Sequence, residues 1–238
     1  MPIFRLSEKI SFPPPHFAEP EGLLAVGGDL SEKRVLLAYQ MGIFPWFGED
    51  EPILWWSPDP RLLLYPSDIY VPRRLKRIIR QQSFKITCDT AFRDVISACA
   101  SVRTHNFQET WIVEEMNDAY CRLFDSGYAH SIEVWQEDRL AGGLYGLSLG
   151  GSFFGESMFS YVSNTSKIAL IALCRFLNTL SFDLIDCQVK TGHLMRMGAV
   201  EVPRSLFLKK LHHSMTKQTL KGNWKNAFQA FYDRCTWQ

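Results

Sequence analysis

The 238-residue sequence has no apolar run close to the roughly 18 residues that a membrane-spanning helix needs. Its amino terminus soon reaches Pro13-Pro14-Pro15 and has no apolar region of the kind found in signal peptides. Six cysteines are scattered along the chain without a CxxC pair, which argues against a zinc ligand set and against a secreted disulfide framework. These absences predict a soluble, cytoplasmic protein with no membrane segment.

Several catalytic signatures are missing as well. The sequence contains no GxxxxGK[ST] phosphate loop, no GxGxxG dinucleotide turn and no HExxH metal motif. The segment GESMF at residues 155–159 lacks the second glycine of a GxSxG elbow, so a hydrolase-type serine is not expected. We therefore expect neither a metal nor another cofactor.

The composition indicates a globular protein, and basic residues are concentrated in one segment. Hydrophobic residues make up 46% of the sequence, charged residues 21%, and the formal net charge is only +1. Attraction to a polyanion must therefore come from local clusters. A predicted helix over residues 72–82 and its flank hold such a cluster, with no acidic residue between Ile69 and Cys88. Its cations are Arg73, Arg74, Lys76, Arg77, Arg80 and, just beyond the helix, Lys85. This pattern predicts contacts to nucleic-acid phosphates, and an ordinary solvated helix face is the alternative.

The pattern of elements predicts an α+β fold in two parts. A small N-terminal domain over residues 1–65 is dense in aromatic residues and prolines, and a second domain covers residues 66–238. In the second, strands expected over residues 131–135, 140–149 and 152–160 precede a helix over 165–180 and strands over 182–189 and 199–202. This order resembles the GNAT acyltransferase fold with its mixed β-sheet, in which two adjacent strands part to form a cleft.

Two of these strands carry polar side chains where a buried strand should have none. Since alternate residues of a strand point the same way, Asp186 and Gln188 should share one face, and Glu156, Met158 and Ser160 should share another. A carboxylate in an apolar wall must be hydrogen-bonded, paired or open to a wet cleft. These polar residues therefore have two possible interpretations, a catalytic site or a purely structural network.

Several motifs together resemble the leucyl/phenylalanyl-tRNA–protein transferases, with similarity from about residue 20 to about residue 208. The motifs are LLAVGGDL (residues 23–30), GIFPWF (42–47), LWWSPDPR (54–61), TWI (110–112), HSIEVW (130–135), GESMFS (155–160) and LIDCQV (184–189). The resemblance implies transfer of leucine, phenylalanine or, less well, methionine from aminoacyl-tRNA to proteins that begin with arginine or lysine. The product is then marked for degradation by the N-end rule. It also implies a small N-terminal domain followed by a GNAT-like domain.

The same resemblance assigns site residues. Trp46 and Trp111 would hold the terminal adenosine of the tRNA. The aminoacyl side-chain pocket maps onto Leu144, Phe153, Met158, Leu177 and Ile185. The family pattern leads us to expect methionine at the position of Leu144 and phenylalanine at the position of Leu177. The two leucines are therefore expected to affect which aminoacyl-tRNA the enzyme prefers as donor.

The chemistry of the residues agrees with such a transfer. An aminoacyl ester is already activated, so the reaction needs no ATP, metal or cofactor. We expect Asp186 and Gln188 to orient the attacking amine and help its proton leave, and Glu156 to recognise the cationic end of the acceptor. In the family, Gln188 is proposed as a base relayed through Asp186, but a neutral amide suits an orienting hydrogen bond better.

Two alternatives remain at this stage. One is another tRNA-dependent aminoacyltransferase, of the peptidoglycan type. The other is a non-catalytic tRNA-binding protein whose strand carboxylates are structural. If the chain is instead a leucyl/phenylalanyl-tRNA–protein transferase, its expected partners are aminoacyl-tRNA carrying leucine, phenylalanine or methionine and acceptor proteins that begin with arginine or lysine. The enzyme is then expected to act as a monomer.

Overall fold

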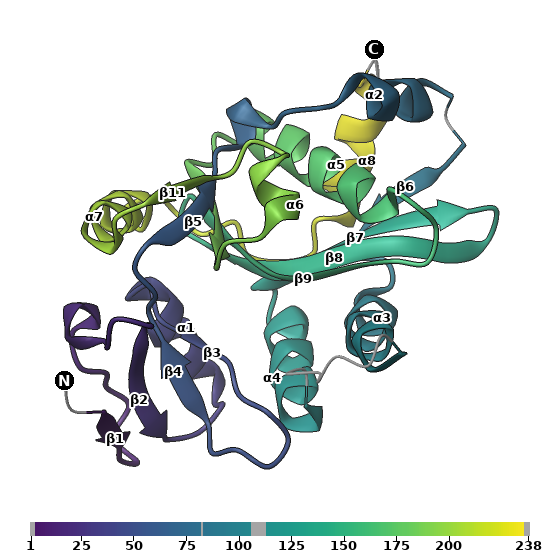
Figure 1. Cartoon of the computed structure of the whole chain (residues 1–238). Helices are drawn as coiled ribbons and strands as arrows, with labels where there is room; N and C mark the ends of the chain where they lie inside the picture. The colour runs from purple at the N-terminus through teal and green to yellow at the C-terminus, as the bar shows by residue number, and fades with distance from the viewer. Residues whose placement is uncertain (1–2, 82, 106–112, 236–238) are drawn as a thin grey trace.

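The structure, a computed structural model, describes residues 3–81, 83–105 and 113–235. Within them the chain forms a small N-terminal domain and a larger domain built on a single mixed sheet (Figure 1). The α+β fold class and the small N-terminal domain are confirmed. None of the helices in the described ranges is long and apolar enough to cross a membrane.

The small domain contains a four-stranded sheet in the order β1-β2-β4-β3, packed against one helix. Its elements are β1 (Phe4–Leu6), β2 (Leu23–Gly27), α1 (Glu32–Gln40), β3 (Phe44–Pro45) and β4 (Leu54–Trp56). Helix α1 stops just before Gly42, which has a left-handed φ of 75°. A Cβ at Gly42 would lie 2.8 Å from the Phe207 ring, so only glycine permits this close approach to the larger domain.

The domain boundary lies earlier than the sequence indicates. Strand β5 (Arg61–Leu64) pairs with strands of the large sheet and not with the small one. Leu62 and Leu64 join the core on one face of that sheet, while Leu63 joins the core on the other. A strand buried on both faces belongs inside a large sheet. The predicted boundary at residue 65 is therefore wrong, and the small domain ends before Arg61.

Seven strands form the large sheet in the order β11-β5-β10-β9-β8-β7-β6. Their remaining bounds are β6 (Lys85–Cys88), β7 (Ala129–Gln136), β8 (Arg139–Leu149), β9 (Ser152–Ser160), β10 (Leu184–Gln188) and β11 (Val200–Val202). Strands β9 and β10 run parallel, and the other pairs in this sheet are antiparallel. The predicted hairpin meander followed by a crossover helix and a further strand is thus present.

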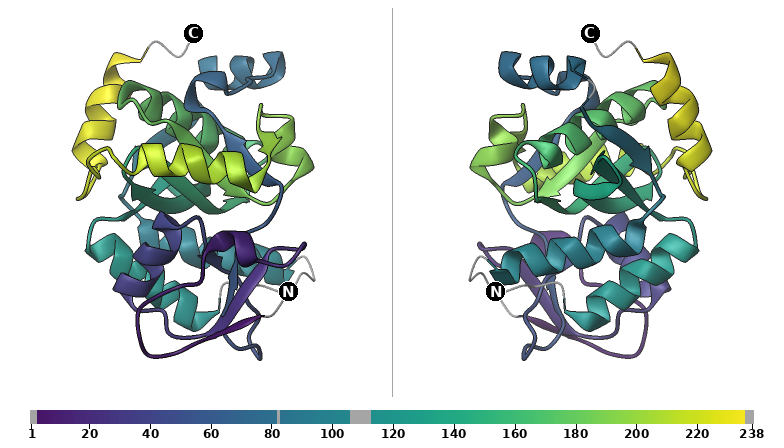
Figure 2. Two further views of the ribbon diagram at one scale, coloured as in Figure 1. Left: turned by 90° about the vertical axis from the view of Figure 1, so that its left-hand side faces the viewer. Right: turned by 90° about the vertical axis from the view of Figure 1, so that its right-hand side faces the viewer.

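Helices cover both faces of the large sheet (Figures 1 and 2). One face packs against α2 (Arg73–Arg80), α5 (Thr165–Thr179) and α8 (Lys225–Arg234). The other packs against α3 (Phe92–His105), α4 (Glu114–Asp125), α7 (Arg204–Ser214) and the small domain. The sheet therefore separates an α5 side from a small-domain side, and the short helix α6 (Gly192–Met195) follows β10.

Candidate active site

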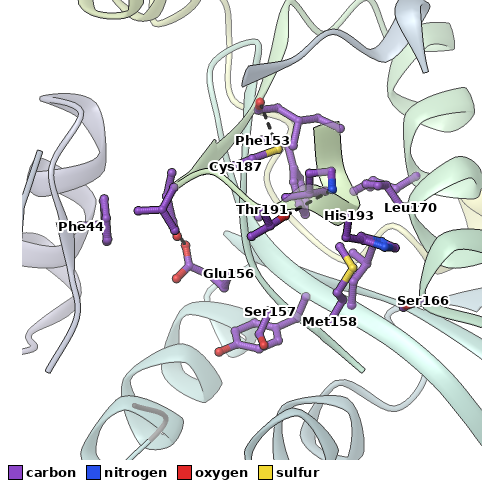
Figure 3. A pocket seen from close by; sticks show the side chains of 18 of the residues that line it. Phe44, Phe153, Glu156, Ser157, Met158, Ser166, Leu170, Cys187, Thr191 and His193 are labelled. Atoms are coloured by element: carbon purple, nitrogen blue, oxygen red, sulfur yellow. Dashed lines mark hydrogen bonds between the residues drawn. The ribbon is translucent and has the colours of Figure 1, made fainter. Parts of the chain in front are cut away.

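Strands β9 and β10 part in the middle of the large sheet. They pair from Leu184 opposite Ser152 to Asp186 opposite Phe154, and no pairing continues beyond that point. A cavity of about 370 Å³ opens there. Its walls include Phe44, Pro45 and Trp46 of the small domain, as well as Leu170 and Leu173 of α5. Because these walls belong to opposite sides of the sheet, the cavity reaches both faces through the gap between the strands (Figure 3).

A β-bulge decides which way the residues of β9 point. Tyr145 of β8 lies opposite Ser157 and Gly146 lies opposite Gly155, so Glu156 is the extra residue. Phe153 and Met158 consequently share the α5 side although five positions separate them, and Glu156 contacts α1 and α4 on the small-domain side. The prediction that Glu156 and Met158 share a face is therefore wrong, since a bulge shifts the alternation by one residue.

The end of the cavity on the α5 side is mainly apolar. Four of the five residues assigned to the aminoacyl pocket line it, namely Leu144, Phe153, Met158 and Ile185. Leu170 and Leu173 of α5 also line it, as do the polar residues Ser166, Thr191 and His193 (Figure 3). Leu177 lies one helical turn beyond Leu173, fully buried and outside the lining. The assignment of Leu177 to the pocket is therefore not supported, because the gap between the strands lies nearer the start of α5.

The rim on the small-domain side carries Trp46. Its side chain is 42% exposed, lines the cavity and lies 5.9 Å from the ring of Trp56 between centroids. An exposed indole at a cavity mouth is suited to stacking on a base. Trp111, the other residue assigned to adenosine, lies outside the described residues.

Glu156 is held by three donors at the small-domain side of the gap. Tyr39 of α1 donates to Oε1 at 2.7 Å and Tyr120 of α4 donates to Oε2 at 2.7 Å. The amide of Gln188 donates to Oε1 at 2.9 Å. Burial raises the pKa of Glu156 to about 7, these hydrogen bonds lower it, and the nearby Asp186 charge raises it. The carboxyl can therefore gain or lose a proton near neutral pH.

Asp186 does not line the cavity. Its side chain is fully buried, and its two oxygens bind Nε and one terminal nitrogen of Arg61 at 2.8 and 2.6 Å. The rings of Phe44 and Phe207 enclose that guanidinium at 4.8 and 4.6 Å. The expectation that Asp186 contacts the attacking amine does not fit this geometry, because the carboxylate is already used by a buried ion pair.

Gln188 connects that ion pair to Glu156. Its backbone N–H donates to Asp186 Oδ1 at 2.9 Å, while its side chain reaches Glu156. Gln188 has a left-handed φ of 63°, beside an irregularity in the pairing with β5. This conformation is unfavourable for a non-glycine residue, so the Asp186 hydrogen bond helps to hold it. Asp186 and Gln188 therefore belong to one network, in which Asp186 contacts the backbone of Gln188. The register shift between them means that simple strand alternation does not account for this arrangement.

Sequence reasoning missed Tyr39, Tyr120 and Arg61. Both tyrosines lie in apolar helix stripes that read as ordinary core, and each is at most 1% exposed. The available signal was the hydroxyl itself, since a buried tyrosine needs a hydrogen-bond partner. Cys187 lines the cavity between Asp186 and Gln188, and burial raises the pKa of its thiol, as expected for an inert cysteine.

The basic segment forms the exposed face of α2, with Leu75 and Ile79 buried beneath it. Arg73, Arg74, Lys76, Arg77 and Arg80 are all exposed, as is Lys85 at the start of β6. The structure therefore agrees with the predicted placement of these cations on a solvent-facing surface. Their contact to tRNA phosphates stays a prediction.

Glu156→Gln is expected to stabilise the protein at pH 8. Folding raises the pKa of Glu156 from 4.5 to about 7, so the folded state binds this proton more tightly. The protonated Glu156 carboxyl therefore makes its full contribution to folded-state stability below about pH 4.5, and this contribution is lost as the pH rises through about 7. At pH 8 the buried charge costs on the order of 3 kcal/mol, which the neutral amide removes. Urea unfolding should show that the variant is more stable than the wild type at pH 8 and differs little from it at pH 4. Equal stability of the two proteins at pH 8 would contradict this expectation.

Comparison with known proteins gives one consistent family. Residues 63–212 match the model of the family described as leucyl/phenylalanyl-tRNA protein transferase, and residues 28–59 match the model of its N-terminal domain. A leucyl/phenylalanyl-tRNA–protein transferase of Desulforapulum autotrophicum is 56% identical over 224 residues, or 94% of this chain and 98% of the relative. Another, of Desulfatibacillum aliphaticivorans, is 57% identical over 94% of this chain and 96% of its own length.

Similarity to solved structures is distant. An aminoglycoside acetyltransferase from an uncultured soil metagenomic sample, in complex with sisomicin, is 11% identical with a TM-score of 0.38, over 48% of this chain and 84% of its own. A GCN5-related N-acetyltransferase from Kribbella flavida is 9% identical with a TM-score of 0.37, over 70% and 59%.

Proposed function

The chain belongs to the leucyl/phenylalanyl-tRNA–protein transferase family, whose members are aminoacyltransferases, and from that premise we propose its substrates and the roles of its residues. It transfers leucine or phenylalanine, and less well methionine, from aminoacyl-tRNA to the α-amino group of proteins that begin with arginine or lysine. The enzyme acts as a monomer, and the added residue marks the product for degradation by the N-end rule.

The cavity through the parted strands is the observation that carries this proposal. Its α5 side is lined mainly by aliphatic and aromatic side chains, with Ser166, Thr191 and His193 as polar residues among them. Its small-domain side has the exposed indole of Trp46. An aminoacyl adenosine has the same division, with an apolar side chain at one end and a base at the other. Its ester would then lie between them, beside Glu156 and Gln188. A volume of about 370 Å³ is within the usual range for a small-molecule site.

The acceptor amine approaches the ester from the small-domain side. There Glu156 offers a carboxylate to the cationic amino terminus, and Gln188 offers an amide that orients the amine. A peptide α-amine has a reference pKa of roughly 7.7–8.0, so a useful fraction is neutral near pH 7. Because the ester is already activated, holding the two groups together in a cavity supplies much of the rate.

A transfer assay tests the proposal. Labelled phenylalanyl-tRNA is incubated with the protein and a peptide that begins with arginine, and transfer of the label to the peptide is measured. Transfer should require a free amino terminus on the peptide. Peptides beginning with lysine or alanine test acceptor choice, and leucyl- and methionyl-tRNA test donor choice. An N-acetylated arginine peptide is the control. Equal transfer to the alanine peptide would refute the acceptor specificity, and tRNA binding without product would favour a non-catalytic tRNA-binding protein.

The exposed cations of α2 are proposed to bind tRNA phosphates. Replacing Arg73, Arg77 and Arg80 with alanine should weaken tRNA binding and lower the slope of log affinity against log salt by roughly 2–3. The matched control is Arg93→Ala, because this exposed arginine already pairs with Asp125. Affinity measured between 50 and 300 mM salt gives both slopes. A slope in the triple variant equal to that of the control would exclude α2 from the tRNA interface.

A further inference from the structure

Three oxygen-bearing groups form a closed ring at the junction of the two domains. The hydroxyls of Tyr39 and Tyr120 lie 2.6 Å apart, and each lies 2.7 Å from a different oxygen of Glu156. Tyr39 comes from the small domain, Tyr120 from α4 and Glu156 from the bulge of β9. Their side chains are almost completely enclosed, with Glu156 the most exposed residue at 8%. Water is therefore largely excluded from the three contacts.

Counting protons shows what this ring requires. Three oxygen–oxygen contacts at hydrogen-bond distance need three protons, and the two tyrosine hydroxyls supply two. If Glu156 is ionised, both hydroxyls donate to it, and the two tyrosine oxygens face each other at 2.6 Å with no proton between them. If Glu156 is protonated at Oε2, it donates to Tyr120, Tyr120 donates to Tyr39, and Tyr39 donates to Oε1. All three contacts are then satisfied.

Gln188 fits the protonated arrangement. Its amide donates to Oε1, which leaves Oε2 as the oxygen that carries the proton. The neighbouring charges are those of Asp186 on β10 and Arg61 on β5, which pair with each other. Tyr145 of β8 packs edge-on against Tyr120 with ring centroids 5.5 Å apart. Burial raises the pKa of both Tyr39 and Tyr120 well above 10, so they remain neutral donors.

We propose that Glu156 is the proton acceptor of the transfer reaction, and that Tyr39 and Tyr120 position it by closing a hydrogen-bonded ring around its carboxyl group. This inference rests on the proposed function. The neutral amine attacks the ester carbonyl carbon, a C–N bond forms, and the carbonyl electron pair moves to oxygen. Glu156 takes one proton from the positively charged nitrogen. The bond between the carbonyl carbon and the ribose oxygen then breaks, the leaving oxygen receives the proton from Glu156, and the carboxylate is restored.

The properties of Glu156 match this task. Glu156 lines the cavity beside Gln188, so its carboxyl group adjoins the space where the amine and the ester would meet. A pKa near 7 allows the same group to take a proton and return it. An ordinary surface glutamate, with a pKa near 4.3, would be a much weaker base.

The test compares Tyr39→Phe and Tyr120→Phe with the wild type. If the hydroxyls only donate to an ionised carboxylate, removing one must raise the pKa of Glu156. In the wild type these hydrogen bonds lower the pKa of Glu156. We therefore expect a higher pKa of Glu156 in both variants, seen both in the pH dependence of kcat and in the ¹³C NMR titration of labelled glutamate, assigned with Glu156→Gln.

Three further measurements complete the design. Tyr161→Phe, at an exposed tyrosine outside the cavity, should leave the pH profile unchanged. Glu156→Gln should fold, bind charged tRNA and lose roughly 10²–10⁴-fold in kcat. A pKa that falls or stays constant in both tyrosine variants, or a Glu156→Gln enzyme within tenfold of wild type, would overturn the inference. The NMR titration needs no substrate, so it remains decisive if the wild type transfers nothing, which would refute the proposed function instead.

Discussion

Replacing Asp186 with alanine is expected to lower the free energy of unfolding by about 3–5 kcal/mol. The side chains of Asp186 and Arg61 are both 0% exposed, and Asp186 is the carboxylate that binds this guanidinium. Without it, a charge that cannot lose its proton stays buried between the rings of Phe44 and Phe207. The backbone N–H of Gln188 also loses its acceptor.

Urea unfolding followed by far-UV circular dichroism measures this effect. A double variant, Arg61→Met with Asp186→Leu, removes both charges and should recover most of the lost stability. Asp125→Ala is the matched control, because it breaks an Arg–Asp pair in which both side chains are more than half exposed, and should change the unfolding midpoint little. An Asp186→Ala variant as stable as Asp125→Ala would show that the buried pair is not needed for folding.

This result would change how activity data at position 186 are interpreted. Asp186 touches Arg61 and the backbone of Gln188 but does not line the cavity. An inactive Asp186→Ala enzyme could therefore have lost its fold, or the conformation of Gln188, without losing a group that acts on the substrate. Glu156→Gln and Gln188→Ala leave the Arg61–Asp186 pair intact and are the cleaner tests of chemistry.

The parts of the fold with a simple period were predictable from the sequence. Strands β7, β8 and β9 and helix α5 lie close to their expected ranges, because alternation and helical spacing are local properties. Strand β5 was assigned to the wrong domain, because its partners β10 and β11 lie more than 100 residues further along the chain. No local pattern reports which of two sheets a short apolar strand joins.

The position of the candidate site was predictable from the sequence, but the directions in which its side chains point were not. Polar residues in apolar strands did mark the gap, and Glu156 and Gln188 do line it. Their orientation depends on irregularities in β9 and β10, and strict alternation fails at such points. The partners Arg61, Tyr39 and Tyr120 come from three distant elements, so only the folded chain brings them to Asp186 and Glu156.

Gly155→Val is expected to lower transfer strongly while the protein still folds. Gly155 lies where β9 leaves β10, and it lines the cavity. A Cβ built there would lie 3.8 Å from the carbonyl oxygen of Asp186 and 3.9 Å from Ile185, which is ordinary contact. Alanine should therefore fit without a shift, whereas the two methyl groups of valine would extend into the gap that connects the two sides of the sheet. Under the proposed function, the aminoacyl ester lies in that gap so that its side chain reaches the apolar end.

The expected loss is at least about 10²-fold in kcat/KM, the size that a misplacement of about 1 Å can produce. Gly155→Ala is the matched control, since it adds the same Cβ without filling the gap, and should retain most of the activity. Thermal unfolding should show that both variants fold, and tRNA affinity should change little because the proposed phosphate contacts lie on α2. A folded Gly155→Val enzyme with the activity of Gly155→Ala would mean that the ester does not pass between β9 and β10. The donor and the acceptor would then have to meet on one side of the sheet, and the apolar end lined by Leu144 and Met158 would need another occupant.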